Sequence, residues 1–348
     1  MWKTLIHRLE QGEPLLEEEW LYLIQMEDAD GLSFLQERAR ATARARFGTG
    51  IYVRGLIEVS NYCRNNCYYC GIRSGNASVH RYRLDAEAIL DCCHHGYSLG
   101  FRTFVLQGGE DPRQTDDFIA DVVSQIRVRF PDCAITLSLG EKSREAYERF
   151  FQAGANRYLL RHETFHAVHY RQLHPPQMSR DFRLQCLSDL KEIGYQVGTG
   201  IMVGSPGQTA DDLAADLYFI QELAPAMIGI GPFIPHHATP FAAEPAGSLQ
   251  QTLKLISLFR LMHPSALIPS TTALATLSPE GRTAGILAGA NVVMPNLSPP
   301  AERKNYELYD EKAALGAESA EGLALLSEQL AAIGYSIDYG RGDFQAER

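Results

Sequence analysis

The sequence predicts an α/β fold, namely a (β/α)8 TIM barrel with a helical N-terminal lead-in and a C-terminal extension. Eight short apolar runs alternate with longer stretches of helical periodicity, a pattern typical of βα units whose parallel sheet is buried on both faces. Polar and glycine residues gather just after these runs, where barrels of this kind carry their active sites. A doubly wound open sheet also fits the periodicity and stays open as an alternative.

The predicted strands are compact apolar runs bounded by polar or glycine residues. We place them at residues 53–60, 102–109, 134–140, 156–163, 196–204, 226–233, 267–273 and 291–296. Residues 1–48 are predicted to form a helical extension, residues 49–304 the barrel, and residues 305–348 an extension packed on the barrel.

The predicted helices lie between these strands. Several begin at an Asp, Ser or Thr suited to capping, and several end at a glycine. They cover residues 85–100, 115–130, 143–154, 181–194, 209–224, 249–262 and 278–289.

Composition excludes several functional classes. No apolar run approaches the ~20 residues needed to cross a bilayer, so a membrane-spanning protein is excluded. The N-terminus carries acidic residues and predicts an amphipathic helix rather than a signal peptide, so we expect a cytoplasmic protein. A formal net charge of -10 disfavours nucleic acid as a partner.

The chain has seven cysteines, and three of them lie close together after the first predicted strand. Cys63, Cys67 and Cys70 could hold three irons of a 4Fe-4S cluster and leave the fourth iron open. A zinc site completed elsewhere, with His80 as the nearest histidine, fits the three cysteines about equally well. The other four are interpreted as small buried hydrophobic residues: Cys92, Cys93, Cys133 and Cys186.

Two motifs resemble those of the radical S-adenosylmethionine (SAM) enzymes. CRNNCYYC, residues 63–70, matches the CxxxCxΦC signature, with Tyr69 as its aromatic residue, and Gly108, Gly109 and Glu110 look like the GGE motif. The resemblance implies one 4Fe-4S cluster, held by the three cysteines, whose open iron is chelated by S-adenosyl-L-methionine. It also implies an external electron donor and reductive cleavage of SAM to a 5′-deoxyadenosyl radical.

A run of further motifs resembles the HydE-type maturases of [FeFe] hydrogenases. LQGGEDP, TLSLGE, RYLLRHET, GIMVGSPGQT, IPSTTA and VVMPN recur in that order, and the resemblance covers about residues 50–310. It implies a role in building the di-iron subcluster, with a small cysteine-bound iron carbonyl cyanide complex as substrate. We expect transient contact with other maturases and a monomer.

Two alternatives remain. Methylornithine synthase is the nearer enzyme rival, because related biotin synthase-like barrels share the cysteine motif, whereas biotin synthase itself needs further barrel cysteines. A ferredoxin-like electron carrier or iron–sulfur scaffold is the non-enzyme rival. No cysteine follows Cys186, so the second cluster that relatives often carry is expected to be absent.

The resemblance also implies roles for individual residues. Contacts to SAM are expected from Tyr69, Gln107, Gly108, Gly109, Glu110, Ser138, Glu163, Arg183 and Met202. Substrate contacts inside the barrel are expected from Arg54, Thr136, Arg161, Met227, Thr271, Thr272, Met294, Tyr306 and Tyr309. Cations and hydroxyls suit cyanide and carboxylate groups in a water-poor cavity. For every interior residue except Arg161, a packing role is an equally good interpretation.

Two other patterns are interpreted as decoys. HETFH, residues 162–166, matches HExxH, but it begins at a strand end, so the helical geometry that a zinc hydrolase needs is expected to fail. GTGIMVG, residues 198–204, is better interpreted as a strand with close backbone approach than as a dinucleotide fingerprint. His236 and His237 follow a strand end, which leaves a site role open for them.

Overall fold

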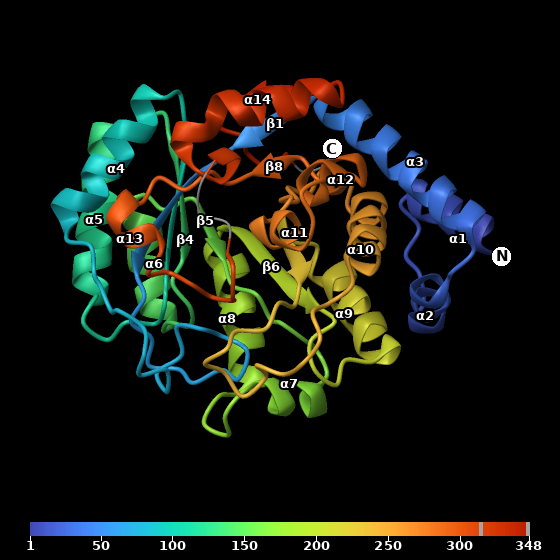
Figure 1. Ribbon diagram of the computed structural model, residues 1–348, viewed down its shortest axis with the longest axis horizontal. Coiled ribbons are helices and arrows are strands. Elements are labelled where there is room, and N and C mark those ends of the chain that lie inside the picture. Colours follow the sequence, from blue (N-terminus) through green and yellow to red (C-terminus); the bar gives the residue numbers. More distant parts are fainter. Residues whose placement is uncertain (313–315, 346–348) are drawn as a thin grey trace.

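The structure is a computed structural model that describes residues 1–312 and 316–345. Parallel strands run in chain order through its main sheet (Figure 1). These strands are β2 (Gly55–Ser60), β3 (Thr103–Gly108), β4 (Ala134–Ser138), β5 (Arg157–Leu159), β6 (Gln196–Val203) and β7 (Met227–Pro232).

A second, smaller sheet closes the ring. It has the order β8 (Val292–Val293), β1 (Gly50–Val53) and β9 (Ser336–Asp338). Parallel bridges join Met227 to Leu267, Pro269 to Val292, and Leu56 to Asn296. The predicted eight-unit barrel is therefore confirmed, and the open-sheet alternative is wrong.

Three predicted strands differ in detail. The run 53–60 changes partner at Arg54, because β1 pairs with β8 and β9 whereas β2 pairs with β3. The run 267–273 makes only single bridges, since Pro269 has no N–H to donate and Thr271 already begins a helix. The run 156–163 ends its ladder at Leu159 and resumes as a single bridge at Glu163.

The seven predicted helices are present and cover the outside of the barrel (Figure 1). Six of them begin at a side chain that accepts the backbone N–H three residues further on: Asp85, Thr115, Ser143, Ser179, Thr209 and Ser248. The helices are α4 (Ala86–Ser98), α5 (Asp116–Arg129), α6 (Arg144–Ala153), α8 (Arg180–Ile193), α9 (Ala210–Leu223), α10 (Leu249–Met262) and α12 (Gly281–Leu287). Three short helices were not predicted: α7 (Ala167–Leu173), α11 (Thr272–Leu277) and α13 (Pro300–Arg303).

The N-terminal helices lie against one side of the barrel. α2 (Glu17–Gln25) packs on α9, and α3 (Ala29–Phe47) packs on α10, while α1 (Trp2–Glu10) contacts both α3 and α10. Trp20 is fully buried in this contact. No helix in the described ranges is long and apolar enough to cross a membrane.

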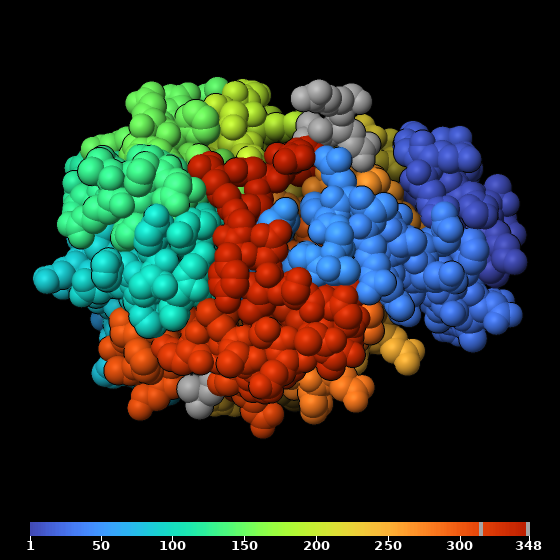
Figure 2. All heavy atoms as spheres, turned by 90° about the horizontal axis from the view of Figure 1, so that it is seen from above, coloured from blue at the N-terminus to red at the C-terminus, as the bar shows by residue number. Residues whose placement is uncertain are grey.

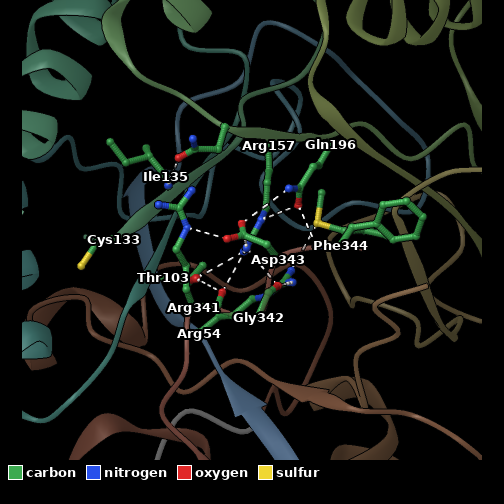
Figure 3. A network of polar contacts seen from close by, with 12 residues as sticks. Arg54, Thr103, Cys133, Ile135, Arg157, Gln196, Arg341, Gly342, Asp343 and Phe344 are labelled. Carbon is green, nitrogen blue, oxygen red and sulfur yellow. Dashed lines mark hydrogen bonds and ion pairs between the residues drawn. The ribbon is translucent and has the colours of Figure 1, made fainter. Parts of the chain in front are cut away.

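The C-terminal segment crosses the amino-terminal end of the barrel, which we call the barrel floor. After the turns η1 (Gly316–Glu318) and η2 (Ala320–Gly322), α14 (Leu323–Ala332) leads into β9. Figure 2 shows this red segment lying between α4 and α5 on one side and α3 on the other. Beyond β9, Arg157 donates to the carbonyl of Gly342 at 2.9 Å and to the carboxylate of Asp343 at 2.7 Å (Figure 3). Residues 341–344 therefore close the floor.

Candidate active site

The three motif cysteines lie in a loop that follows β2, which we call the cysteine loop (residues 61–76). It has no regular structure, so its carbonyl groups need other partners. Arg81 supplies many of them, because its guanidinium donates to the carbonyls of Ile72 at 2.8 Å, Arg73 at 2.7 Å and Asn76 at 3.1 Å. The side chain of Asn76 donates to the carbonyl of Gly71 at 2.7 Å. The loop is thus held by side chains rather than by a ladder.

The three cysteines are all partly buried. Burial raises the pKa of each thiol, to about 12 for Cys70, with the neighbouring thiols adding to the effect there and at Cys67. A bound metal would therefore have to displace the protons.

The spacing of the sulfurs limits what they can hold. Over the described residues, only His236, His237 and Asp310 bring three ligand atoms within 4.8 Å of one another, so at least one pair of the cysteine sulfurs is further apart. Sulfurs on one tetrahedral zinc ion would lie roughly 3.8 Å apart. The three sulfurs are therefore not gathered as they would be around one tetrahedral ion.

The predicted GGE turn packs directly on the cysteine loop. A Cβ on Gly109 would lie 2.2 Å from the carbonyl oxygen of Tyr62 and 2.7 Å from Cβ of Cys63, so only glycine fits there. Glu110 accepts the backbone N–H of Glu141 at 2.9 Å and the guanidinium Nε of Arg64 at 2.9 Å. The turn thereby places a fixed carboxylate beside the cysteines.

Two ion pairs lie at the ends of β4 and β5. Arg183 donates to Glu141 at 2.7 Å and to the carbonyl of Arg161 at 3.0 Å. Arg161 and Glu163 form a second pair at 3.1 Å. Glu163 holds a left-handed backbone with φ of 66°, which is strained for a glutamate and is a conformation that functional sites often retain. Apart from this ion pair, its Oε2 atom has no partner in the described part of the chain.

The space enclosed by the strands, which we call the lumen, is polar and holds unpartnered groups. Outward residues such as Ile135 and Leu137 pack under the helices, so the alternate residues of β4, Thr136 and Ser138, face the lumen. Among the described residues, buried atoms without a hydrogen-bond partner include the hydroxyls of Thr136 and Thr271 and the Nε of Arg161. Because such atoms are costly when unpaired, they fit a polar ligand in the lumen.

The SAM residues implied by the resemblance converge at this end of the barrel. The rings of Tyr69 and Phe233 pack with Met202 and Leu173 in one apolar cluster. Gln107 and Ser138 are paired in register at the ends of β3 and β4. Eight of the nine predicted SAM residues therefore lie on consecutive strand ends and on the loops joined to them, and the ninth, Arg183, lies in the first turn of α8.

The predicted substrate residues separate into two groups. Thr136, Arg161 and Thr271 line the lumen, Thr272 donates to Glu318 at 2.8 Å, and Tyr306 and Tyr309 come from the C-terminal extension. Tyr306 is fully buried and its side chain contacts Gln107.

The second group lies at the barrel floor. Arg54 donates to the sulfur of Met227 at 3.2 Å and approaches the carbonyl of Gly342 at 3.5 Å, and Met294 packs in the same cluster as Met227. Arg54 precedes β2 whereas the cysteine loop follows it, a separation of roughly 20 Å for six residues of strand. The structure does not bring these three residues to the cysteines.

Two acidic residues that sequence reasoning did not assign belong to the site. Glu141 pairs with Arg183, and Glu58 is fully buried in the barrel wall, where it accepts from Asn296 at 2.8 Å and pairs with Lys312. Glu58 alternates with Arg54 and Leu56 along one face of the chain, so its inward direction could have been predicted from the strand period.

The decoy patterns have other roles. His162 is fully buried and bonds to Thr199 and Asp216, whereas His166 precedes α7 and bonds to Asp212, so the HExxH residues do not converge. A Cβ on Gly200 would lie 1.7 Å from the carbonyl oxygen of Gly229, which confirms close backbone approach in GTGIMVG. The four cysteines outside the loop are buried as expected.

His236, His237 and Asp310 form the three-atom group noted above, close to Gly71 of the cysteine loop. The backbone N–H of Ala238 donates to Nδ1 of His236 at 3.0 Å. Because Nδ1 accepts, the neutral ring carries its proton on Nε2, the atom that would face a metal. This tautomer opposes metal binding at His236.

Comparison with known proteins places the chain in a family. The radical SAM superfamily model matches residues 57–220. The chain is 48% identical over 269 residues to the "[FeFe] hydrogenase maturase subunit HydE" of Thermotoga maritima, covering 77% of this chain and 76% of that protein. It is 30% identical over 302 residues to 3-methylornithine synthase of Methanosarcina barkeri, covering 86% and 85%. A crystal structure of methylornithine synthase matches with a TM-score of 0.84 at 27% identity, over 96% of this chain and 97% of that one.

The site and the comparisons agree. The cysteine loop, the GGE turn and the strand ends that carry Glu163 and Met202 all fall inside the region that the superfamily model matches. The relative with 48% identity covers more than two thirds of both chains. The chain therefore belongs to the radical SAM superfamily, and within it to the HydE family of [FeFe] hydrogenase maturases.

Proposed function

We propose that this radical SAM enzyme acts in [FeFe] hydrogenase maturation, on a small cysteine-bound iron carbonyl cyanide complex from which the di-iron subcluster is built. The observation that carries the proposal is the direct packing of Gly109 on Tyr62 and Cys63, which joins a three-cysteine loop to a carboxylate turn at the mouth of a polar lumen. The 48% identity to a HydE subunit supports the same assignment.

Cys63, Cys67 and Cys70 would hold one 4Fe-4S cluster, and the CxxxCxΦC motif within the region matched by the radical SAM model supports this ligation over a zinc ion. When bound, the reduced cluster and SAM would supply a 5′-deoxyadenosyl radical. Glu110 would accept from the ammonium group of SAM, because its carboxylate is already fixed by two donors. Arg183 would face the SAM carboxylate, and Tyr69 with Met202 would form the apolar wall beside the adenine.

The lumen would bind the substrate through Arg161 and the hydroxyls of Thr136 and Thr271. Each has a buried polar atom without a hydrogen-bond partner among the described residues, and a cyanide or carboxylate group would supply the missing acceptor. Tyr306 and Tyr309 would close the lumen from the side of the C-terminal extension. The floor group of Arg54, Met227 and Met294 would contribute only indirectly, through the shape of the lumen.

A partner maturase would deliver the substrate, and an external donor would reduce the cluster. The protein would act as a monomer, and it would work in the cytoplasm, where a reducing compartment keeps its seven cysteines as free thiols.

The biochemical test uses protein reconstituted anaerobically with iron and sulfide. With dithionite and SAM, the wild type should release 5′-deoxyadenosine, whereas an electron carrier or scaffold would not. Cys67→Ala should reduce this release to background, while Cys92→Ala, which removes a buried thiol outside the loop, should retain it. Release by Cys67→Ala equal to the wild type would refute the cluster assignment.

The biological test separates the two enzyme candidates. Methylornithine synthase is favoured as the second candidate by the TM-score of 0.84 and by the 30% identity to such an enzyme. Deletion of the gene in a host with an [FeFe] hydrogenase should leave that hydrogenase without its di-iron subcluster. An active hydrogenase in the deletion strain, together with 3-methylornithine formation by the purified protein, would establish the second candidate instead.

A further inference from the structure

His174 bridges two aromatic rings beside the cysteine loop. Its Nδ1 lies 2.9 Å from the carbonyl oxygen of Tyr170 and its Nε2 lies 3.2 Å from the hydroxyl of Tyr69. A carbonyl can only accept, so Nδ1 carries the proton and Nε2 accepts from Tyr69. The imidazole stacks on the ring of Tyr170 at 4.0 Å and meets the ring of Tyr69 edge-on at 5.4 Å. Both the tautomer and the ring orientation of His174 are therefore fixed.

The segment around His174 contacts the cysteine loop at two other points. The backbone N–H of Tyr68 donates to the carbonyl of Leu173 at 3.0 Å, and the thiol of Cys67 lies 3.7 Å from the sulfur of Met178. The segment takes this course because Pro175 follows His174, which ends α7 and holds His174 extended, with φ of -129° and ψ of 149°. His174 is 1% exposed, so the bridge is shielded from competing water.

We propose that His174 is a positioning residue for SAM binding, which acts by holding the ring of Tyr69 against Met202. The inference rests on the proposed function, in which Tyr69 belongs to the wall of the SAM site. Without the acceptor on His174, the Tyr69 hydroxyl would keep only its contact with the side chain of Cys67, and the ring would be held less firmly in one rotamer. A ring that is ordered before SAM arrives lowers the entropic cost of binding.

The test compares four variants of the reconstituted, dithionite-reduced full-length protein. SAM is titrated while the electron paramagnetic resonance signal of the reduced cluster is followed. His174→Phe keeps the stacked ring but removes both hydrogen bonds, and Tyr69→Phe removes the hydroxyl from the other side. We expect each to raise the apparent Kd for SAM about five- to tenfold, the effect of one lost hydrogen bond. The double variant should bind SAM no less tightly than the single variant with the higher Kd, because both changes break the same contact.

His174→Gln should partly restore SAM binding. Its amide can still accept from Tyr69, so its Kd should lie nearer the wild type than that of His174→Phe. Iron content and melting temperature should stay near wild type in all four, which distinguishes positioning from a structural role. In ¹⁵N-histidine NMR spectra of the wild type, His174 should appear as the Nδ1–H tautomer.

Each contrary result overturns the inference. Unchanged SAM affinity in His174→Phe, additive losses in the double variant, or an Nε2–H tautomer would each do so. Iron loss in His174→Phe that Gln does not restore would show a structural role instead. If the wild-type signal itself does not respond to SAM, the proposed function fails and the inference fails with it.

Discussion

Gly109 lies where the turn after β3 touches the cysteine loop, and its missing side chain is what permits that contact. The neighbouring Gly108 is less crowded, because a Cβ there would lie 3.2 Å from Val59, 3.3 Å from the carbonyl oxygen of Ser60 and 3.4 Å from Leu139. The sequence motif therefore contains two glycines of unequal importance. Pattern alone does not separate them, because the difference comes from a backbone more than 40 residues away in the chain.

Alanine substitutions should separate the two glycines. Gly109→Ala requires the backbone at Tyr62 to move, so reconstituted iron content and SAM binding should both fall sharply. Gly108→Ala needs shifts of only a few tenths of an ångström and should retain most of both. Iron analysis and SAM titration of the two variants check this, and equal behaviour would contradict it.

The buried His174 should also make the stability of the fold sensitive to acid. Burial lowers its pKa to about 3, and the nearby Arg183 adds to the effect. The unfolded chain, with a histidine pKa of about 6.5, binds a proton that the folded protein excludes, so stability is complete above that pH and falls as the pH decreases towards 3.

The loss of unfolding free energy due to His174 should be about 1.3 kcal/mol between pH 7 and pH 5.5. Urea unfolding of cluster-free protein at pH 7 and pH 5.5 measures this loss of unfolding free energy. In His174→Phe the loss should be smaller than in the wild type by about this amount. An identical pH dependence in the two proteins would exclude this histidine as the cause.

At the scale of elements, the cysteine loop is an irregular segment for which one arginine is a main anchor. Arg81 lies beyond the loop and donates to carbonyls at both of its ends. Nothing in the spacing of the cysteines predicts this anchor. The helices, in contrast, were predicted almost completely, because their caps and apolar faces are local properties of the chain.

Removal of the anchor should affect the loop more than the barrel. Arg81→Met leaves several carbonyls of the loop without donors, so we expect iron retention after reconstitution to fall several-fold while the melting temperature drops by only a few degrees. Arg73→Met is the matched control, because Arg73 lies in the same loop and its Nε makes no hydrogen bond in the described residues. Equal iron loss in both variants would mean that the loss of a positively charged side chain, rather than of the Arg81 hydrogen bonds, is responsible.

At the scale of the whole molecule, the C-terminal segment completes the barrel at its floor. The fully buried Arg157 meets Asp343 across 186 positions of sequence, and β9 adds to β1 in the same region. Figure 3 shows Arg54, Thr103 and Arg157 converging on residues 341–343. The closed floor leaves the opposite end, which carries the cysteine loop, as the side that faces ligands.

The pair of Arg157 and Asp343 should contribute to global stability. Asp343→Asn leaves a buried guanidinium without its carboxylate, so the free energy of unfolding should fall. Arg157→Met should lower the free energy of unfolding less in the Asp343→Asn variant than in the wild type. The coupling between the two changes should be about 1 to 3 kcal/mol. Urea unfolding of the wild type, both single variants and the double variant measures this coupling energy. A coupling near zero would show that the pair does not stabilise the floor.

The sequence by itself determined the barrel, its helices, the cysteine loop and the strand ends that carry Glu110, Glu163 and Met202. It could do so because periodicity, caps and motif spacing are local, and because parallel strands bring their carboxyl ends to one face. Only the tertiary structure decided that Arg54, Met227 and Met294 belong to the floor, and that Glu58 and His174 join the site. Those placements depend on strand register, on a change of strand partner and on contacts between distant segments, none of which is encoded in any short stretch of the chain.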